Sequence, residues 1–297
     1  MFDEFKSAFH RPNNAHVQLI IINVTIFLVI GVISVIGEIA SVTVFSDFIY
    51  NQFTIPPVIG EYLSRPWTLI TYMFAHSRWD IFHILFNMLV FYWFGRLFVE
   101  YLGSDKLVAL YVLGGLAGGV LYLLMFNTVP YYIERSGFPG MVGASAAVYA
   151  IVVATAALLP NYTFFLLFFG PVRIKYIAGF YVVISFLGTT QANAGGNIAH
   201  LGGALIGFIY LKQLQAGINW GGWITATLDW FQDLFKSKPK VKVTYRSEEK
   251  VMKKPVKVTA SKSSQAEIDA ILDKISDRGY ESLTKEEKEK LFNASKK

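Results

Sequence analysis

The sequence contains no cysteine, which excludes disulfides, thiolate metal sites and a cysteine nucleophile. Charge is also scarce, because charged residues make up 16% of the chain against about 25% in soluble globular proteins. The 54% of hydrophobic residues is too high for a disordered chain. The composition therefore argues against an ordinary cytosolic enzyme. An aromatic fraction of 16% suits a membrane protein with aromatic side chains at the lipid–water interface.

The basic excess is confined to a C-terminal tail. Nine basic and nine acidic residues precede Lys212, whereas 18 basic and 12 acidic residues lie from Lys212 onward. The first part of the chain is thus neutral, and the tail carries the whole net charge of +6. We interpret the tail as a segment attracted to anionic membrane lipid and expect no nucleic-acid partner.

Six apolar runs predict an all-α membrane protein with six transmembrane helices. A bilayer core needs about 20 apolar residues, so the fifth and sixth runs are short. The first run follows acidic residues and exceeds the roughly 7–15 apolar residues of a signal peptide, which favours a retained helix. The runs are Val17 to Gly37, Ile81 to Gly95, Leu107 to Pro130, Gly143 to Leu159, Tyr176 to Leu187 and Ile198 to Leu211.

The distribution of Lys and Arg in the loops predicts the orientation. With the N-terminus inside, six basic residues before the tail lie in inside loops and three in outside loops. Both termini are therefore expected in the cytoplasm, with a bacterial inner membrane as the location. Glycines four residues apart, such as Gly114 with Gly118 and Gly203 with Gly207, predict helices that pack closely.

Polar groups inside the predicted spans mark a candidate site, because ionisable residues are costly in a membrane. The spans contain His83 and His200, and Ser145 stands at the start of the fourth. Each of the three follows the outer start of a span that runs inward. We therefore expect them to share one depth, about 5–10 Å below the outer face at 1.5 Å per residue.

Ser145 and His200 form the minimum set for covalent acyl transfer, with the serine as nucleophile and the histidine as base. No span supplies the carboxylate that usually orients the imidazole, so ring stacking by Tyr149 is the predicted substitute. Three donors are available for a developing oxyanion: the His83 ring, the Asn87 amide and the backbone N–H of Ser145.

Each residue alone has a plainer explanation. A membrane-helix serine usually bonds to its own backbone, and Asn87 alone could join two helices. A lone histidine could bind a metal or relay protons, but no ligand motif accompanies either one, so we expect neither metal nor cofactor. Two other functions stay open: a non-catalytic membrane binding protein and a transporter. The pattern does not fix an oligomeric state.

Three short motifs resemble those of the rhomboid family of intramembrane serine proteases. They are His83-Ile-Leu-Phe-Asn87, Gly143-Ala-Ser145-Ala and Ala199-His200-Leu-Gly-Gly203, and the stretch from Trp67 to His76 is also similar. The resemblance covers roughly residues 17–212.

The resemblance implies that Ser145 is the nucleophile, that His200 is the base and that Tyr149 stacks on His200. It also implies an oxyanion hole of His83, Asn87 and the Ser145 N–H. The substrate would be a membrane-anchored protein, cut in or near its membrane segment without a cofactor. The first loop would lie partly in the membrane, and residues 188–197 would cap the site.

One position departs from the family pattern. Many rhomboids have Gly after the serine, whereas this chain has Ala146. We expect the extra methyl group to narrow the cavity beside the nucleophile.

The tail predicts a membrane-surface helix and a small hairpin. Trp220, Trp223, Trp230, Phe231 and Phe235 are typical of an interfacial helix. Capping boxes at 264–267 and 284–287 predict helices over about 265–277 and 285–294. The chain thus divides into a cytoplasmic segment (1–16), a six-helix membrane domain (17–215), an interfacial helix with a basic linker (216–262) and a helical segment (263–297).

Overall fold

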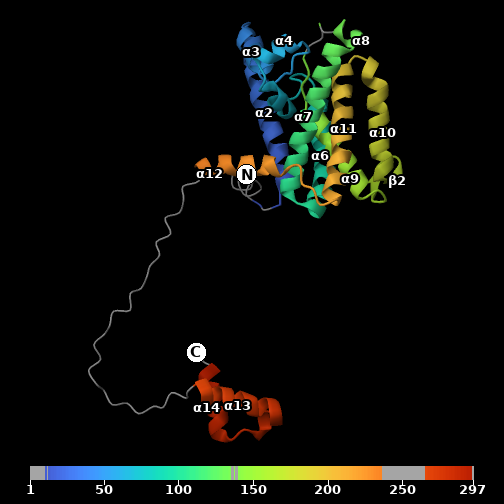
Figure 1. Cartoon of the computed structure of the whole chain (residues 1–297). Coiled ribbons are helices and arrows are strands. Elements are labelled where there is room, and N and C mark those ends of the chain that lie inside the picture. Colours follow the sequence, from blue (N-terminus) through green and yellow to red (C-terminus); the bar gives the residue numbers. More distant parts are fainter. Residues whose placement is uncertain (1–10, 12, 135–136, 138–139, 236–264, 296–297) are drawn as a thin grey trace, which may run out of the picture. The chain divides into compact units, whose positions relative to one another are not determined.

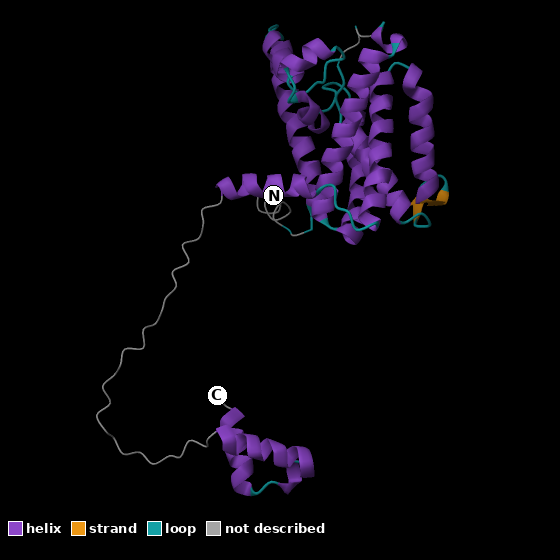
Figure 2. Cartoon of the chain, viewed as in Figure 1, coloured by secondary structure: helices purple, strands orange, loops and turns teal. Residues whose placement is uncertain are grey.

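The computed structural model describes residue 11, residues 13–134, residue 137, residues 140–235 and residues 265–295. The chain forms two units, residues 1–237 and residues 238–297, which are treated separately below. Helices dominate the described parts of both units (Figure 2).

Each of the six apolar runs forms a helix in the first unit. Four of these helices are long and apolar enough to cross a membrane within the described residues: α2 (Ala15–Ile39), α6 (Ile81–Leu102), α7 (Ser104–Thr128) and α11 (Ala194–Gln215). The other two, α9 (Ser145–Leu158) and α10 (Ile174–Leu187), are shorter. This is a mostly helical, multi-pass membrane protein, with the six helices running side by side (Figure 1).

Several helix ends differ from the ends of the apolar runs, and the largest difference is at the end of α6. Helix α6 continues beyond Gly95 to Leu102, because a helix can include charged residues such as Arg96 and Glu100 that interrupt an apolar run. It ends before Gly103, whose φ is +86°. Helix α11 begins at Ala194 rather than at Ile198, so only residues 191–193 separate it from the short η2 turn (Gly188–Thr190). The Asn197 amide donates to the Gly188 carbonyl at 2.9 Å and so ties this turn to the new helix.

The first loop contains short helices rather than an open connection. They are α3 (Val44–Asn51), α4 (Ile59–Ser64), α5 (Thr68–Thr71) and the η1 turn (Tyr72–Phe74). Buried tyrosines anchor η1, since Tyr111 Oη donates to the Met73 carbonyl and Tyr72 Oη donates to the Gly115 carbonyl, each at 2.6 Å. The loop is thereby fixed against α7.

Helices α7, α9 and α11 pack through glycine and alanine, as the glycine spacing predicts. A Cβ atom added at Gly114 would lie 2.5 Å from Ala150 Cβ of α9. Added at Gly203, it would collide with the Ala146 carbonyl oxygen, also of α9. Backbones therefore touch directly here, which gives close packing where lipid supplies no hydrophobic drive.

A β-hairpin corrects the all-α expectation. Strands β1 (Thr163–Leu166) and β2 (Gly170–Arg173) pair antiparallel, with Thr163 opposite Arg173 and Leu166 opposite Gly170. The turn closes at Gly170, whose φ of +67° suits a residue without Cβ. Aromatic residues in this segment favour strands, and Phe165, Phe168 and Phe169 are exposed.

The described part of the first unit also contains α8 (Pro130–Ile133) and α12 (Gly222–Phe235). Helix α12 covers most of the predicted interfacial segment. Trp223 and Trp230 are more than half exposed, whereas Ile224 is buried. A Cβ atom at Gly221, just before α12, would press on Ala109 of α7, so the start of this helix lies against the bundle.

The described residues of the second unit, 265–295, form a helical hairpin, as predicted. It comprises α13 (Gln265–Arg278), the η3 turn (Tyr280–Ser282) and α14 (Lys285–Ser295). The second capping box forms: the Thr284 N–H donates to Glu287 Oε2 at 2.7 Å, and the Glu287 N–H donates to Thr284 Oγ1 at 3.3 Å. The first capping box at Ser264 and the basic linker lie outside the described residues.

Candidate active site

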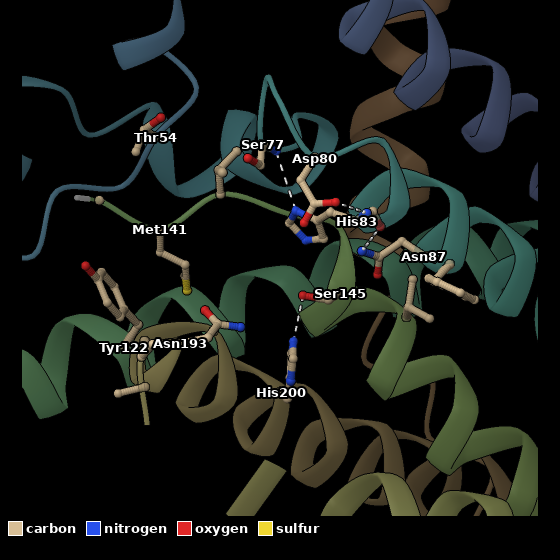
Figure 3. A pocket seen from close by; sticks show the side chains of 18 of the residues that line it. Thr54, Ser77, Asp80, His83, Asn87, Tyr122, Met141, Ser145, Asn193 and His200 are labelled. Carbon is tan, nitrogen blue, oxygen red and sulfur yellow. Dashed lines mark hydrogen bonds between the residues drawn. The ribbon is translucent and has the colours of Figure 1, made fainter. Parts of the chain in front are cut away.

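Ser145 and His200 come from different helices and meet in the bundle. Ser145 opens α9 and His200 lies in the second turn of α11. Ser145 Oγ lies 2.7 Å from His200 Nε2, a hydrogen-bond distance (Figure 3). This is the geometry that a hydroxyl nucleophile and its base require.

The loop before α9 carries Ser145 into the bundle. Met141 and Ile55 exchange two backbone hydrogen bonds of 2.8 and 2.9 Å, and the Gly143 N–H donates to the Tyr72 carbonyl at 3.1 Å. Such irregular backbone is tolerated inside a membrane protein only where other protein groups satisfy it. The anchored first loop thus sets the position of the α9 N-terminus.

Glycine is needed at position 143 for two reasons. Its φ of +141° is a conformation that residues with a Cβ rarely adopt. A Cβ atom there would also lie 3.1 Å from His83 Nε2 and 3.5 Å from Ser145 Oγ. Gly143 therefore keeps open the space between the His83 ring and the Ser145 hydroxyl.

His83, Ser145 and His200 lie at different distances from the starts of their helices, whereas the apolar runs predicted similar distances. His83 is the third residue of α6 and Ser145 the first of α9, but His200 is the seventh of α11. At 1.5 Å per residue, His200 lies about 9 Å from its helix start. The residues nevertheless meet, because the loop before α9 enters the bundle before that helix begins.

Two neighbours hold the His200 ring. Tyr149, one turn after Ser145, stacks on it with ring centroids 4.1 Å apart and an interplanar angle of 10°. Ser185 of α10 places its Oγ 3.1 Å from His200 Nδ1. The sequence prediction missed Ser185. It is the only serine or threonine in the run Tyr176 to Leu187, and that isolation could have singled it out.

His83 and Asn87 line the same cavity from α6 (Figure 3). Asp80 caps this helix, accepting from the N–H groups of Phe82 and His83 at 3.1 Å each. The Ser77 N–H donates to His83 Nδ1 at 3.5 Å, a contact that favours a ring proton on Nε2, the atom facing Gly143. Asn87 Nδ2 donates one proton to the His83 carbonyl at 2.8 Å and keeps a second.

The cavity has a volume of about 1000 Å³ and is lined by Ser145, Tyr149, His200, His83 and Asn87. All five predicted side chains are therefore brought together. Among the described residues, no group of three His, Asp or Glu side chains is close enough to hold a metal ion. The hydrogen-bond donors and the Ser145–His200 pair have the chemistry that acyl transfer at a carbonyl requires.

Ala146 does not narrow the cavity, contrary to the sequence expectation. Its side chain is 1% exposed and is not part of the cavity lining. A Cβ atom at Gly118 of α7 would lie 2.5 Å from Ala146 Cβ, so the alanine methyl group occupies the space left by that glycine. The reason is helical geometry, because consecutive residues of a helix point in different directions.

The profile of the Rhomboid domain matches residues 63–215, which is just over half of the chain and contains every candidate site residue. The chain belongs to the rhomboid family. A second profile, a family of unknown function (DUF6576), matches residues 259–297 and so covers the helical hairpin behind the rhomboid domain.

Curated proteins that are similar to this chain include a plant rhomboid and a bacterial rhomboid. RHOMBOID-like protein 12, mitochondrial, from Arabidopsis thaliana is 35% identical over 182 residues, which cover 58% of this chain and 53% of that protein. Rhomboid protease GlpG from Haemophilus influenzae is 28% identical over 160 residues, covering 52% of this chain and 72% of GlpG. The match thus spans about half the length of the Arabidopsis protein.

Proposed function

We propose that this rhomboid is an intramembrane serine endopeptidase that cleaves membrane-anchored proteins within or next to their membrane segment. The observation that carries the proposal is the 2.7 Å contact between Ser145 Oγ and His200 Nε2 at a cavity of about 1000 Å³. One relative, GlpG, is named a rhomboid protease, which supports the same chemistry.

The proposed reaction uses only protein groups and water. His200 Nε2 takes the Ser145 proton while the serine oxygen attacks the scissile carbonyl. The oxyanion accepts hydrogen bonds from His83 Nε2, the Asn87 amide and the Ser145 N–H, which has no intrahelical partner at the start of α9. Protonated His200 then gives its proton to the leaving amine, and water hydrolyses the acyl-enzyme by the same steps.

We propose that all six helices cross the bilayer with both termini in the cytoplasm, in line with the loop charges. Helices α9 and α10 have 14 residues each, about 21 Å at 1.5 Å per residue, so part of their path through the core is loop. The hydrophilic turn at 188–193 would cap the cavity, because Asn193 lines it.

A bacterial inner membrane is the proposed location. The Haemophilus relative is a bacterial protein, whereas the name of the Arabidopsis relative assigns that protein to mitochondria. The exposed aromatic face of α12 would lie on the cytoplasmic leaflet and contact membrane lipid.

Labelling with a fluorophosphonate tests the nucleophile. The detergent-solubilised wild type should be labelled, and Ser145→Ala should not, because the probe reacts with the serine hydroxyl. Ser145→Ala and His200→Ala should each abolish cleavage of a model membrane substrate, and the double variant should be no worse. Ser34→Ala in α2 is the matched control, since this buried hydroxyl has no hydrogen-bond partner in the described structure.

Cleavage near the wild-type rate by purified Ser145→Ala would contradict the protease mechanism. A non-catalytic binding protein would retain substrate but show no labelling. A transporter would show proton-coupled flux without labelling of Ser145.

Reporter fusions test the topology. Fusions at Lys297 and in the loop 131–140 should report opposite sides of the membrane. The same side for both would contradict six crossings.

A further inference from the structure

Ser185 links Tyr149 to His200, the ring on which Tyr149 stacks. Its side chain is fully buried on α10, at 0% exposure. Its Oγ donates to Tyr149 Oη at 2.9 Å and lies 3.1 Å from His200 Nδ1. The same imidazole contacts Ser145 Oγ through its other nitrogen, Nε2. The four groups therefore form a continuous hydrogen-bonded chain across α9, α10 and α11.

Counting protons along these hydrogen bonds indicates which nitrogen of His200 is protonated. A serine hydroxyl has one proton to donate. Since that proton is directed at Tyr149 Oη, Ser185 faces His200 Nδ1 with a lone pair. With Ser185 donating to Tyr149, the Nδ1 atom is the donor to Ser185 Oγ. A neutral imidazole has only one N–H, so Nε2 keeps the lone pair that faces Ser145.

We propose that Ser185 is a positioning residue that holds His200 in the Nδ1–H tautomer, the form able to accept the Ser145 proton. It would do so in place of a carboxylate, which usually orients the imidazole in serine hydrolases. A neutral hydroxyl suits this buried place, because a carboxylate would bring a charge into the membrane interior. The catalytic consequence rests on the proposed function, whereas the tautomer does not.

The hydrogen bonds that link Ser145, His200 and Ser185 persist during the proposed reaction. When His200 Nε2 takes the Ser145 proton, the positive imidazolium keeps its Nδ1–H on Ser185 Oγ. A hydrogen bond to a charged group is stronger than one between neutral groups. Ser185 therefore stabilises the state formed at the moment of attack more than the resting state, which predicts an effect on kcat rather than on KM.

Ser185 could instead serve only to hold α10 against the bundle. That role requires a hydrogen bond but no particular His200 tautomer. The two roles therefore differ in the protonation of the imidazole nitrogens, which nitrogen NMR of ¹⁵N-histidine-labelled protein reads directly. Comparison with His200→Ala assigns the His200 signals among the chain's five histidines.

The NMR experiment needs no substrate. In the wild type, His200 Nδ1 should carry the proton and Nε2 should not. In Ser185→Ala, a mixture of both tautomers should appear, because Nδ1 loses its acceptor. A wild-type proton on Nε2, or an unchanged tautomer in Ser185→Ala, would overturn the proposal.

Kinetics on a model membrane substrate form the second arm. Ser185→Ala should lower kcat about tenfold at unchanged KM, the size expected from losing one hydrogen bond. Tyr149→Phe, which keeps the stacked ring but removes the acceptor of the Ser185 proton, should lower kcat about threefold. The double variant should equal Ser185→Ala alone, because both changes break one chain.

Ser34→Ala controls for removing a buried hydroxyl from a membrane helix, and should leave kcat and the tautomer unchanged. If thermal denaturation shows that Ser185→Ala is not folded, Tyr149→Phe becomes the test variant. An unaltered His200 tautomer and an unaltered kcat in Tyr149→Phe would then overturn the proposal. If Ser145→Ala is inactive while Ser185→Ala matches the wild type, only the role of Ser185 fails. If Ser145→Ala still cleaves substrate, the proposed function fails, and the NMR result alone decides the tautomer.

Discussion

The two faces of helix α9 differ in what their side chains contact. Ser145 and Tyr149 face the cavity, whereas Ala146 and Ala150 face the backbones of α7 and α11. On the packed face, an added methyl group has no room. On the cavity face, side chains meet across open space and are placed by hydrogen bonds and stacking. The packed face thus fixes the positions of α7, α9 and α11 relative to one another, and the cavity face leaves room for a substrate beside its polar side chains.

The largest predicted effect comes from breaking the packed face. Gly203→Ala forces a Cβ atom onto the Ala146 carbonyl oxygen, and overpacking of this kind costs about 3 kcal/mol or more where backbone cannot yield. Gly179→Ala on α10 is the matched control, because nothing lies within 4 Å of the added atom. The control should be neutral or slightly stabilising, since alanine favours helix.

Thermal denaturation in detergent measures both variants. Equal melting temperatures for Gly203→Ala and the wild type would mean that α9 and α11 can separate, and that the packed face does not fix their positions.

Gly143→Ala should damage the cavity face while leaving the packed face intact. The new Cβ atom would lie 3.1 Å from His83 Nε2 and would strain the backbone at φ +141°. Displacement of catalytic groups by about 1 Å can cost about 10² in rate, so we expect a roughly 100-fold lower kcat. Cleavage assays with a melting curve on the same preparation test this, and a normal rate would show that the oxyanion region tolerates the shift.

Asn87→Ala probes the same cavity with a smaller change. Among the described residues, its amide bonds within α6 to the His83 carbonyl and to no other helix. We expect kcat to fall roughly 10–100-fold, with little change in KM, as for an oxyanion donor with remaining partners. Fluorophosphonate labelling should persist but slow. A lower melting temperature at unchanged kcat would instead identify Asn87 as structural.

Ala146→Gly should give the smallest effect and sharpen the contrast. Removing the methyl group that fills the space beside Gly118 should destabilise the bundle by roughly 1–2 kcal/mol. Because this methyl group does not line the cavity, substrate preference should not change. A panel of substrates with different residues at the cleavage site tests this, and a shifted preference would show that the methyl group reaches the substrate.

Local patterns predicted much of this protein. The six apolar runs form the six helices α2, α6, α7, α9, α10 and α11. An apolar segment in a membrane must satisfy its backbone hydrogen bonds internally, and a helix does this, so the composition of each run is enough to predict a helix. The 284–287 capping box formed because its partners are three residues apart. The glycine pairs predicted close packing for the same local reason.

Features that depend on distant neighbours were missed. The direction of the Ala146 methyl group depends on how α9 is rotated against α7, and nothing near position 146 encodes that rotation. The hairpin at 163–173 was also missed, since aromatic residues suit an interface and a strand alike.

The sequence by itself determined that this chain enters a membrane, and its motifs indicated that Ser145, His200, His83, Asn87 and Tyr149 act together. Only the tertiary structure decided how they meet. The loop before α9 is drawn inward by hydrogen bonds to Ile55 and Tyr72, residues more than 70 positions away, and α10 delivers Ser185 to His200. Hydrogen bonds depend on distances in space, and spacing along a chain fixes these only within a single helix or turn.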